Sequence, residues 1–232
     1  MRILFSLLFV LAFLPASAQD EARSLVSGIN RRFRSVQDYK ANVDMHFDLP
    51  GVKMNDMKGK VYFKQPDRFR IRAKGIFFLP RQNPMQQVSM LMKDTAAYTA
   101  VITGTETENG VQCTVLNLIP LRTDGELVLG KFWVDPVNML VLRTQITTKS
   151  NGTIESFSRF EPGSLHPLPS EVLVKVELNR IKVPKMMSAD LNKKSKPKTP
   201  SGQKETGTIR MRFSSYEVNT KLQDAVFTED AS

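Results

Sequence analysis

A two-residue alternation of apolar and polar side chains is the feature that most constrains the fold of this chain. From Tyr39 to Leu49 the odd positions are apolar and the even positions are polar or charged. The same alternation runs from residue 58 to residue 75, where basic side chains occupy the even positions Lys58, Lys60, Lys64, Arg68, Arg70, Arg72 and Lys74. Because successive side chains of a strand point to opposite faces, both segments predict strands with one buried and one solvated face.

Similar patterns predict further strands along the rest of the chain, at 96–104, 111–119, 126–134, 139–148, 153–160, 171–181 and 208–218. Turn-forming residues separate them, namely Gln65-Pro66-Asp67, Asn109-Gly110, Asp135-Pro136 and Asn151-Gly152. Residues 20–36 differ, because their apolar side chains recur at helical spacing, with acids in the first turn and arginines near the end. The sequence therefore predicts one amphipathic helix followed by about nine or ten antiparallel strands.

The N-terminal segment is typical of a secretory signal peptide. An apolar run from Ile3 to Leu14 precedes Ala16-Ser17-Ala18, which predicts cleavage after Ala18. We expect residues 19–232 to form a single domain outside the cytoplasm, with a net charge lowered from +10 to +9 by the loss of Arg2. This charge indicates an anionic membrane or acidic partners rather than nucleic acid, although plain solubility also explains it. The single cysteine, Cys113, lies on an apolar strand phase and is interpreted as a small buried hydrophobe.

Two segments interrupt the strand pattern. Residues 76–80 are apolar, and the methionine-rich stretch 83–92 that follows them suits a short helix or a strand. Residues 192–207 contain five lysines and no apolar side chain, so we predict a disordered Lys-rich loop there.

Known catalytic and metal-binding motifs are missing from the sequence. The two histidines, His46 and His166, belong to no paired metal-ligand spacing, and one cysteine cannot build a thiolate zinc site. No nucleophile elbow, phosphate-binding loop or dinucleotide fingerprint occurs. Asp44 and Asp48 are expected to pair with cations of the neighbouring hairpin. We therefore expect a protein that is not an enzyme and that needs no cofactor or metal.

The predicted sheet has more apolar surface than its helix can cover. One helix of about 16 residues shields about two or three strands. The remaining apolar face must pack on itself in a filled barrel, lie under lids or hold a hydrophobic ligand. Plain core packing is the default, but the methionines of 85–92 and Met186-Met187 favour a ligand, because thioether side chains repack around varied shapes.

Four motifs, in this order after the leader and the helix, carry a resemblance to a known family: VYFKQPDRFRIR (61–72), ITGTETENGVQCTVLNLIP (102–120), FWVDPVNMLVLRTQI (132–146) and FSSYEVNTKLQDAVFTED (213–230). Together they resemble the periplasmic lipoprotein-sorting carrier (LolA-like) superfamily over nearly the whole mature chain. The resemblance implies a mainly β (α+β) fold: a curved, unclosed antiparallel half-barrel sheet with an N-terminal amphipathic helix and short lid helices.

The resemblance also implies a cavity for acyl chains on the concave face of the sheet. Its lining would be Val43, Met45, Phe47, Val61, Phe63, Phe69 and Ile71, and its lid would involve Gln65, Phe77, Phe78, Met85, Val88 and Leu91. The outer cations Lys60, Arg68, Arg70 and Arg72 would face a membrane or a partner. Where carriers of the family have an Arg before the Pro, an Arg thought to latch the lid, this chain has Gln65, which donates hydrogen bonds but carries no charge.

The function implied by the resemblance is that of a monomeric, non-enzymatic periplasmic carrier. It would bind the acyl chains of lipoproteins or lipids for transfer toward the outer membrane, and would contact an anionic membrane or envelope proteins only transiently. The alternative is a periplasmic regulatory module of the same fold that senses lipid or binds an envelope protein, because a fold does not fix a function.

Overall fold

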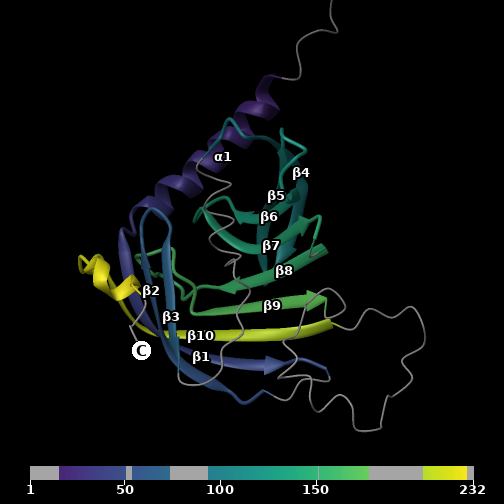
Figure 1. The fold of residues 1–232 in the computed structure, drawn as a ribbon. Helices are drawn as coiled ribbons and strands as arrows, with labels where there is room; N and C mark the ends of the chain where they lie inside the picture. Colours follow the sequence, from purple (N-terminus) through teal and green to yellow (C-terminus); the bar gives the residue numbers. More distant parts are fainter. Residues whose placement is uncertain (1–15, 51–53, 74–93, 151, 178–205, 229–232) are drawn as a thin grey trace, which may run out of the picture.

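The computed structural model describes residues 16–50, 54–73, 94–150, 152–177 and 206–228. These residues form an N-terminal helix α1 (Ala16–Arg34), ten strands and a short C-terminal 3-10 helix η2 (Asp224–Phe227), shown in Figure 1. The strands are β1 (Asp38–Asp48), β2 (Met57–Lys64), β3 (Arg68–Ala73), β4 (Tyr98–Glu108), β5 (Val111–Pro120), β6 (Leu127–Asp135), β7 (Leu140–Thr148), β8 (Gly152–Arg159), β9 (Glu171–Glu177) and β10 (Thr206–Val218).

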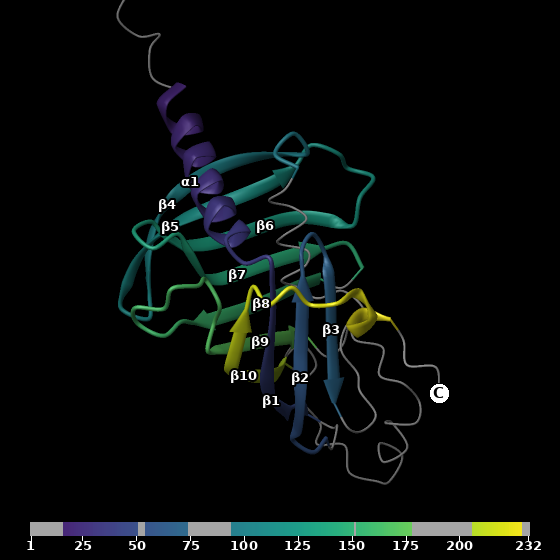
Figure 2. The ribbon, with the colours of Figure 1, turned by 90° about the vertical axis from the view of Figure 1, so that its left-hand side faces the viewer.

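All ten strands belong to one antiparallel sheet in the order β3-β2-β1-β10-β9-β8-β7-β6-β5-β4. Strands β1 to β3 form one meander and strands β4 to β10 form another, and the pairing of β1 with β10 joins the two. The sheet is strongly curved and does not close, because its edge strands β3 and β4 are not paired with each other, as Figures 1 and 2 show. This arrangement confirms the predicted fold class: a mainly β, unclosed antiparallel sheet with an N-terminal helix.

Helix α1 packs on one face of the sheet through an apolar stripe. Ala22, Leu25, Val26 and Ile29 are all buried, at the spacing that places them on one side of a helix. The helix begins at Ala16, earlier than predicted, so Asp20 and Glu21 lie beyond its first turn. The helix ends in a turn in which the backbone N–H groups of Ser35 and Val36 bind carbonyls three residues back.

The strand boundaries agree closely with the sequence pattern, with two differences of note. Strand β4 continues to Glu108 rather than ending at Gly104, because its second half pairs with β5 across the tight turn at Asn109 and Gly110. Strand β10 begins at Thr206, which corrects the predicted loop 192–207 at its C-terminal end: Thr206 and Gly207 pair with β9. The rest of that loop and residues 74–93 lie outside the described residues. No helix in the described part of the chain is long and apolar enough to cross a bilayer.

Candidate functional site

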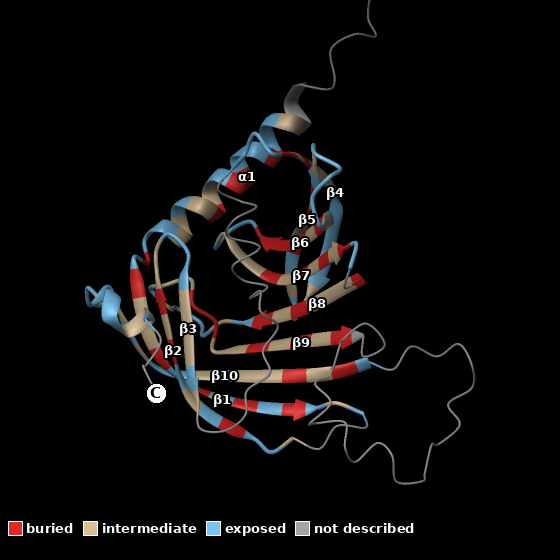
Figure 3. Cartoon of the chain, in the orientation of Figure 1, coloured by how far each residue is buried: buried red, intermediate tan, exposed pale blue. Residues whose placement is uncertain are grey.

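The face of the sheet that carries α1, called the inner face below, is one continuous surface across the molecule. Directly paired residues of antiparallel strands share a face, so the register can be followed from strand to strand. One such row crosses seven strands, from β5 to β1: Leu116, Phe132, Thr144, Ser156, Val174, Ile209 and Phe47. Every member of this row is buried. Figure 3 shows the same alternation of buried and less buried positions along each strand.

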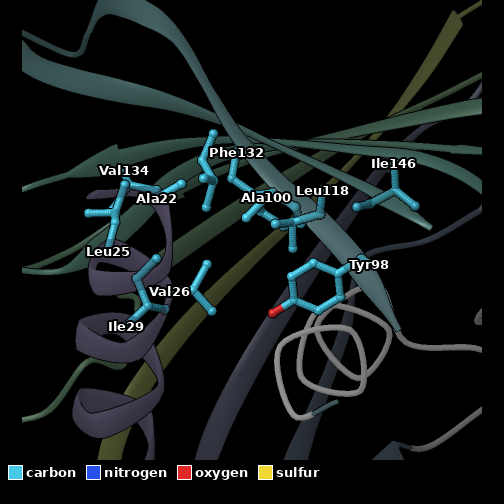
Figure 4. Packing of buried hydrophobic residues seen from close by; sticks show 11 residues of the cluster. Ala22, Leu25, Val26, Ile29, Tyr98, Ala100, Leu118, Phe132, Val134 and Ile146 are labelled. Carbon is cyan, nitrogen blue, oxygen red and sulfur yellow. The ribbon is translucent and has the colours of Figure 1, made fainter. Parts of the chain in front are cut away.

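Two apolar clusters occupy the inner face. The helix-side cluster, shown in Figure 4, joins α1 to strands β4 to β7 and consists of Ala22, Leu25, Val26, Ile29, Tyr98, Ala100, Leu116, Leu118, Phe132, Val134 and Ile146. The hairpin-side cluster joins β1, β2, β9 and β10 and consists of Val43, Met45, Phe47, Met57, Val172, Val174, Val176 and Ile209. Among the described residues, this second cluster includes no residue of a helix. The helix-side cluster includes residues of four strands, and α1 lies closest to β4.

A seam of hydroxyl groups separates the two clusters. Thr144 on β7 and Ser156 on β8 lie opposite each other, and their hydroxyl oxygens are 2.5 Å apart, in a hydrogen bond. Ser158 follows Ser156 on the same face, and all three residues are buried. Within the described residues the inner face is therefore apolar at both ends, with a narrow polar strip along β7 and β8.

The seven residues predicted to line a cavity all lie on this inner face. Val43, Met45, Phe47 and Val61 are buried, as is Phe63, whereas Phe69 and Ile71 are partly exposed. Register confirms that they share one side, because Val61 pairs with Ile71 and Phe63 with Phe69. Phe63 has an additional role, since its ring lies 5.7 Å from that of Phe33 on α1 and 5.4 Å from that of Tyr39. It therefore packs the hairpin against the end of the helix.

Gln65 binds the end of helix α1. Its amide Nε2 donates a hydrogen bond of 2.8 Å to the carbonyl oxygen of Val36 and a longer one of 3.4 Å to that of Phe33. Phe33 lies in the last turn of α1 and Val36 lies two residues beyond the helix, close to the negative end of the helix dipole. Gln65 thus connects the β2–β3 turn to α1 with a neutral donor. The other predicted lid residues, Phe77, Phe78, Met85, Val88 and Leu91, lie outside the described residues.

The cations of the hairpin lie on the opposite, outer face, and the C-terminal segment covers some of them. Asp224 of η2 accepts a hydrogen bond of 2.7 Å from Lys64 and lies 2.6 Å from a guanidinium nitrogen of Arg68. These two contacts lower the pKa of the Asp224 carboxyl. Arg72 donates to the carbonyl oxygen of Val226 and stacks near the Tyr62 ring.

This arrangement changes the prediction for the outer face. Lys64 and Arg68 form ion pairs with Asp224, which the sequence did not suggest. Of the two predicted partners, Asp44 lies opposite a hairpin cation, whereas Asp48 lies beyond the register of β1 with β2. Lys58 and Lys60 remain exposed, in a groove of about 770 Å³ lined also by Asn42, Asp44, Tyr62, Arg72 and Ser214. Asp44 pairs in register with Lys58 across the sheet. Of the four cations predicted to face a membrane or partner, Arg68 and Arg72 are therefore engaged by the C-terminal segment.

Cys113 belongs to a third apolar cluster, on the outer face, with Val115, Trp133 and Leu142. It is fully buried, which confirms its interpretation as a small core residue. Burial, together with the nearby carboxylates of Asp135 and Glu108, raises the pKa of its thiol to about 11. The thiol is thus protonated at neutral pH.

Sequence reasoning located only half of the inner face. It found the residues of the hairpin side but did not single out those beneath α1, among them Tyr98, Phe132 and Ile146. The hydroxyl seam was missed because Ser156 and Ser158 look like solvent-facing positions of a polar strand. Their spacing could have identified them, because they lie two and four residues from Ile154 and therefore share its face of the strand.

The arrangement of strands and helix in this chain is similar to that of several solved structures. No protein-family model and no curated protein matches the sequence. Solved structures do match. A LolA superfamily protein from Nitrosomonas europaea aligns over 90% of this chain and 97% of its own, with 13% identity and a TM-score of 0.55.

Two further structures give similar values. A DUF1329 family protein from Desulfovibrio piger aligns over 91% of this chain and 97% of its own, with 14% identity and a TM-score of 0.58. A domain from Vibrio parahaemolyticus assigned to outer membrane lipoprotein sorting aligns over 90% and 97%, with 10% identity and a TM-score of 0.58. Identities this low describe the fold alone, and the chain has the fold of the LolA superfamily, as its motifs predicted.

Proposed function

We propose that this protein is a non-enzymatic periplasmic carrier that binds the acyl chains of lipoproteins or lipids for transfer toward the outer membrane. The single observation that supports it best is the inner face, which carries one apolar cluster beneath α1 and a second one on the side of the β2–β3 hairpin. The likeness to a domain assigned to outer membrane lipoprotein sorting agrees with this proposal. In our proposal residues 1–18 are removed as a signal peptide, and residues 19–232 act as one domain.

The proposed binding surface is the hairpin side of the inner face. Val43, Met45, Phe47, Val61, Phe63, Phe69 and Ile71 would contact acyl chains there. Ile71 and Phe69 are the members still partly exposed, so they are the side chains with area left to bury against a ligand. Exposed cations of the outer face, such as Lys60, would meet an anionic membrane surface only loosely, which suits a protein that shuttles.

A matched pair of variants tests the binding surface. Ile71→Ala removes three carbons from the inner face, and Leu173→Ala removes three carbons from the partly exposed outer face of β9. At about 0.8 kcal/mol per buried methylene, three carbons amount to about 2.4 kcal/mol, so an acyl chain that buries all three should bind about fiftyfold more weakly to Ile71→Ala. Titration with a fluorescent fatty acid should show this loss, while Leu173→Ala binds as the wild type does.

Native mass spectrometry of the mature protein provides the second test. A carrier purified gently should release lipid, or an acylated peptide, when collisional energy is raised. If the wild type carries no lipid and takes up no fatty acid, the carrier function is refuted. Capture of an envelope protein by that lipid-free protein would then favour the regulatory alternative.

A further inference from the structure

Tyr98 carries a buried hydroxyl group that its surroundings do not explain. The residue is only 6% exposed and belongs to the helix-side cluster, whose other members are all apolar. Its hydroxyl oxygen has no hydrogen-bond partner among the described residues. In Figure 4 this oxygen points to the side of the cluster where Val26 and Ile29 of α1 lie. A polar atom thus lies within the apolar cluster that joins the sheet to the helix.

Leaving such a hydroxyl without a partner is unfavourable. A buried donor that has given up its hydrogen bond to water without forming another lowers the stability of the fold. Phenylalanine would fill nearly the same space without this penalty. The hydroxyl of Tyr216 shows the ordinary case, because it donates a hydrogen bond of 2.8 Å to the carbonyl oxygen of Pro169. The contrast shows that, among the described residues, the Tyr98 hydroxyl is left available to a bound molecule.

The surroundings of Tyr98 define the chemistry of that partner. Burial, and then the nearby carboxylate of Asp94, raise the pKa of the Tyr98 hydroxyl, so at neutral pH it is a donor. The acceptor must be attached to an apolar chain, because all the other side chains of the helix-side cluster are apolar, Leu118 and Ile146 among them. It must also be neutral, because a buried anion is costly and the negative charge of Asp94 opposes one. An ester or amide carbonyl on an acyl chain meets all of these conditions, whereas the carboxylate of a free fatty acid does not.

We propose that Tyr98 is a ligand-binding residue that donates a hydrogen bond to the ester or amide carbonyl of an acylated ligand bound at the β4 end of the inner face. This inference rests on the proposed carrier function and deepens it. It extends the binding region from the hairpin side to the helix side of the inner face. It also predicts that the protein distinguishes esterified or amidated acyl chains from hydrocarbon chains of equal length.

The test uses two probes that differ only in the carbonyl group. Palmitoyl glycerol carries an ester, and hexadecyl glycerol carries an ether in its place. Both compete against a fluorescent acyl probe on the full mature chain, for the wild type, Tyr98→Phe and the control Tyr216→Phe. The wild type should prefer the ester by about fivefold to tenfold, the usual effect of one neutral hydrogen bond. Tyr98→Phe should bind both probes about equally, with its affinity for the ether unchanged.

Thermal melting without ligand separates this role from a structural one. Tyr98→Phe should melt at or above the wild-type temperature, whereas Tyr216→Phe, which loses its bond to Pro169, should melt below it. An ester-to-ether ratio that Tyr98→Phe leaves unchanged, or a melting temperature lowered as much as in Tyr216→Phe, would overturn the inference while leaving the carrier function intact. Failure of the wild type to bind either probe would instead refute the carrier function itself.

Discussion

Replacing Gln65 by glutamate should weaken the attachment of α1 to the sheet in a way that depends on pH. The side chain of Gln65 donates to the carbonyl oxygens of Val36 and Phe33. A glutamate of almost the same shape has no hydrogen to donate when ionised. Its charge would also face the negative end of the helix dipole.

The size of the effect follows from these two contacts. The 2.8 Å bond to Val36 contributes about 1 kcal/mol net, whereas the 3.4 Å bond to Phe33 contributes little. The unfavourable dipole interaction adds up to about 1 kcal/mol. Gln65→Glu should therefore lower the free energy of unfolding by about 2 kcal/mol at neutral pH, or about 4–8 °C in melting temperature for a domain of this size. Gln65→Met, which only loses the bond, should lose about half as much.

The pH dependence distinguishes this mechanism from a general loss of packing. The carbonyl oxygens favour the protonated form of the new carboxyl, so its pKa is higher in the folded than in the unfolded state. Stability of Gln65→Glu is then greatest below the unfolded-state pKa and is lost as pH rises through the folded-state value. Gln65→Met lacks this dependence and serves as the control.

Urea denaturation at several pH values measures the effect, and hydrogen exchange of the amides of α1 shows where it acts. The protection lost by Gln65→Glu at neutral pH should return on acidification. Equal stability of the Glu and Met variants at every pH would refute the assigned role of Gln65. Gln65→Arg should be at least as stable as the wild type, because a cation is favoured at this end of a helix.

Three other perturbations should have specific results. Gly59→Ala places a methyl group 2.6 Å from the backbone carbonyl oxygen of Arg72, so urea denaturation should show a loss of about 1–3 kcal/mol, whereas Gly125→Ala, with open space around it, should be neutral. Cys113 should resist thiol reagents in the native state and react once urea unfolds the chain; rapid native labelling would contradict its burial. The ion pairs of Asp224 lower its pKa, so they stabilise the fold above the ordinary carboxyl pKa and this stabilisation is lost as pH falls through the lowered value. Asp224→Asn should therefore lose less stability on acidification than the wild type. Equal losses in the two proteins would show that these ion pairs do not contribute.

The local elements could be read from the sequence because each depends on neighbouring residues. The alternation from Tyr39 to Leu49 predicted β1 almost to the residue, since one face is buried along its whole length. The end of β4 could not be read, because residues 105–108 are polar and are strands only through pairing with β5. The start of β10 could not be predicted for the same reason, because its first two residues are in a strand only through pairing with β9.

Contacts between distant segments were beyond what local patterns can show. Nothing in the sequence around Asp224 indicates that it contacts Lys64 and Arg68, because these residues meet only after the whole sheet has formed. That the Tyr98 hydroxyl has no partner among the residues that the structure describes is likewise a property of packing, not of sequence. The binding roles of the inner-face residues remain predictions.

The pairing of β1 with β10 affects how the protein folds. Residues far apart in the chain meet there, Met45 opposite Met211 for example, so this seam requires a large loop to close and forms slowly. Because a chain is synthesised from its N-terminus, β1, β2 and β3 are present long before β10. Until then the edge of β1 is an unpaired template for strands of other chains. We therefore expect the newly made chain to be prone to aggregation until its last strand pairs with β1.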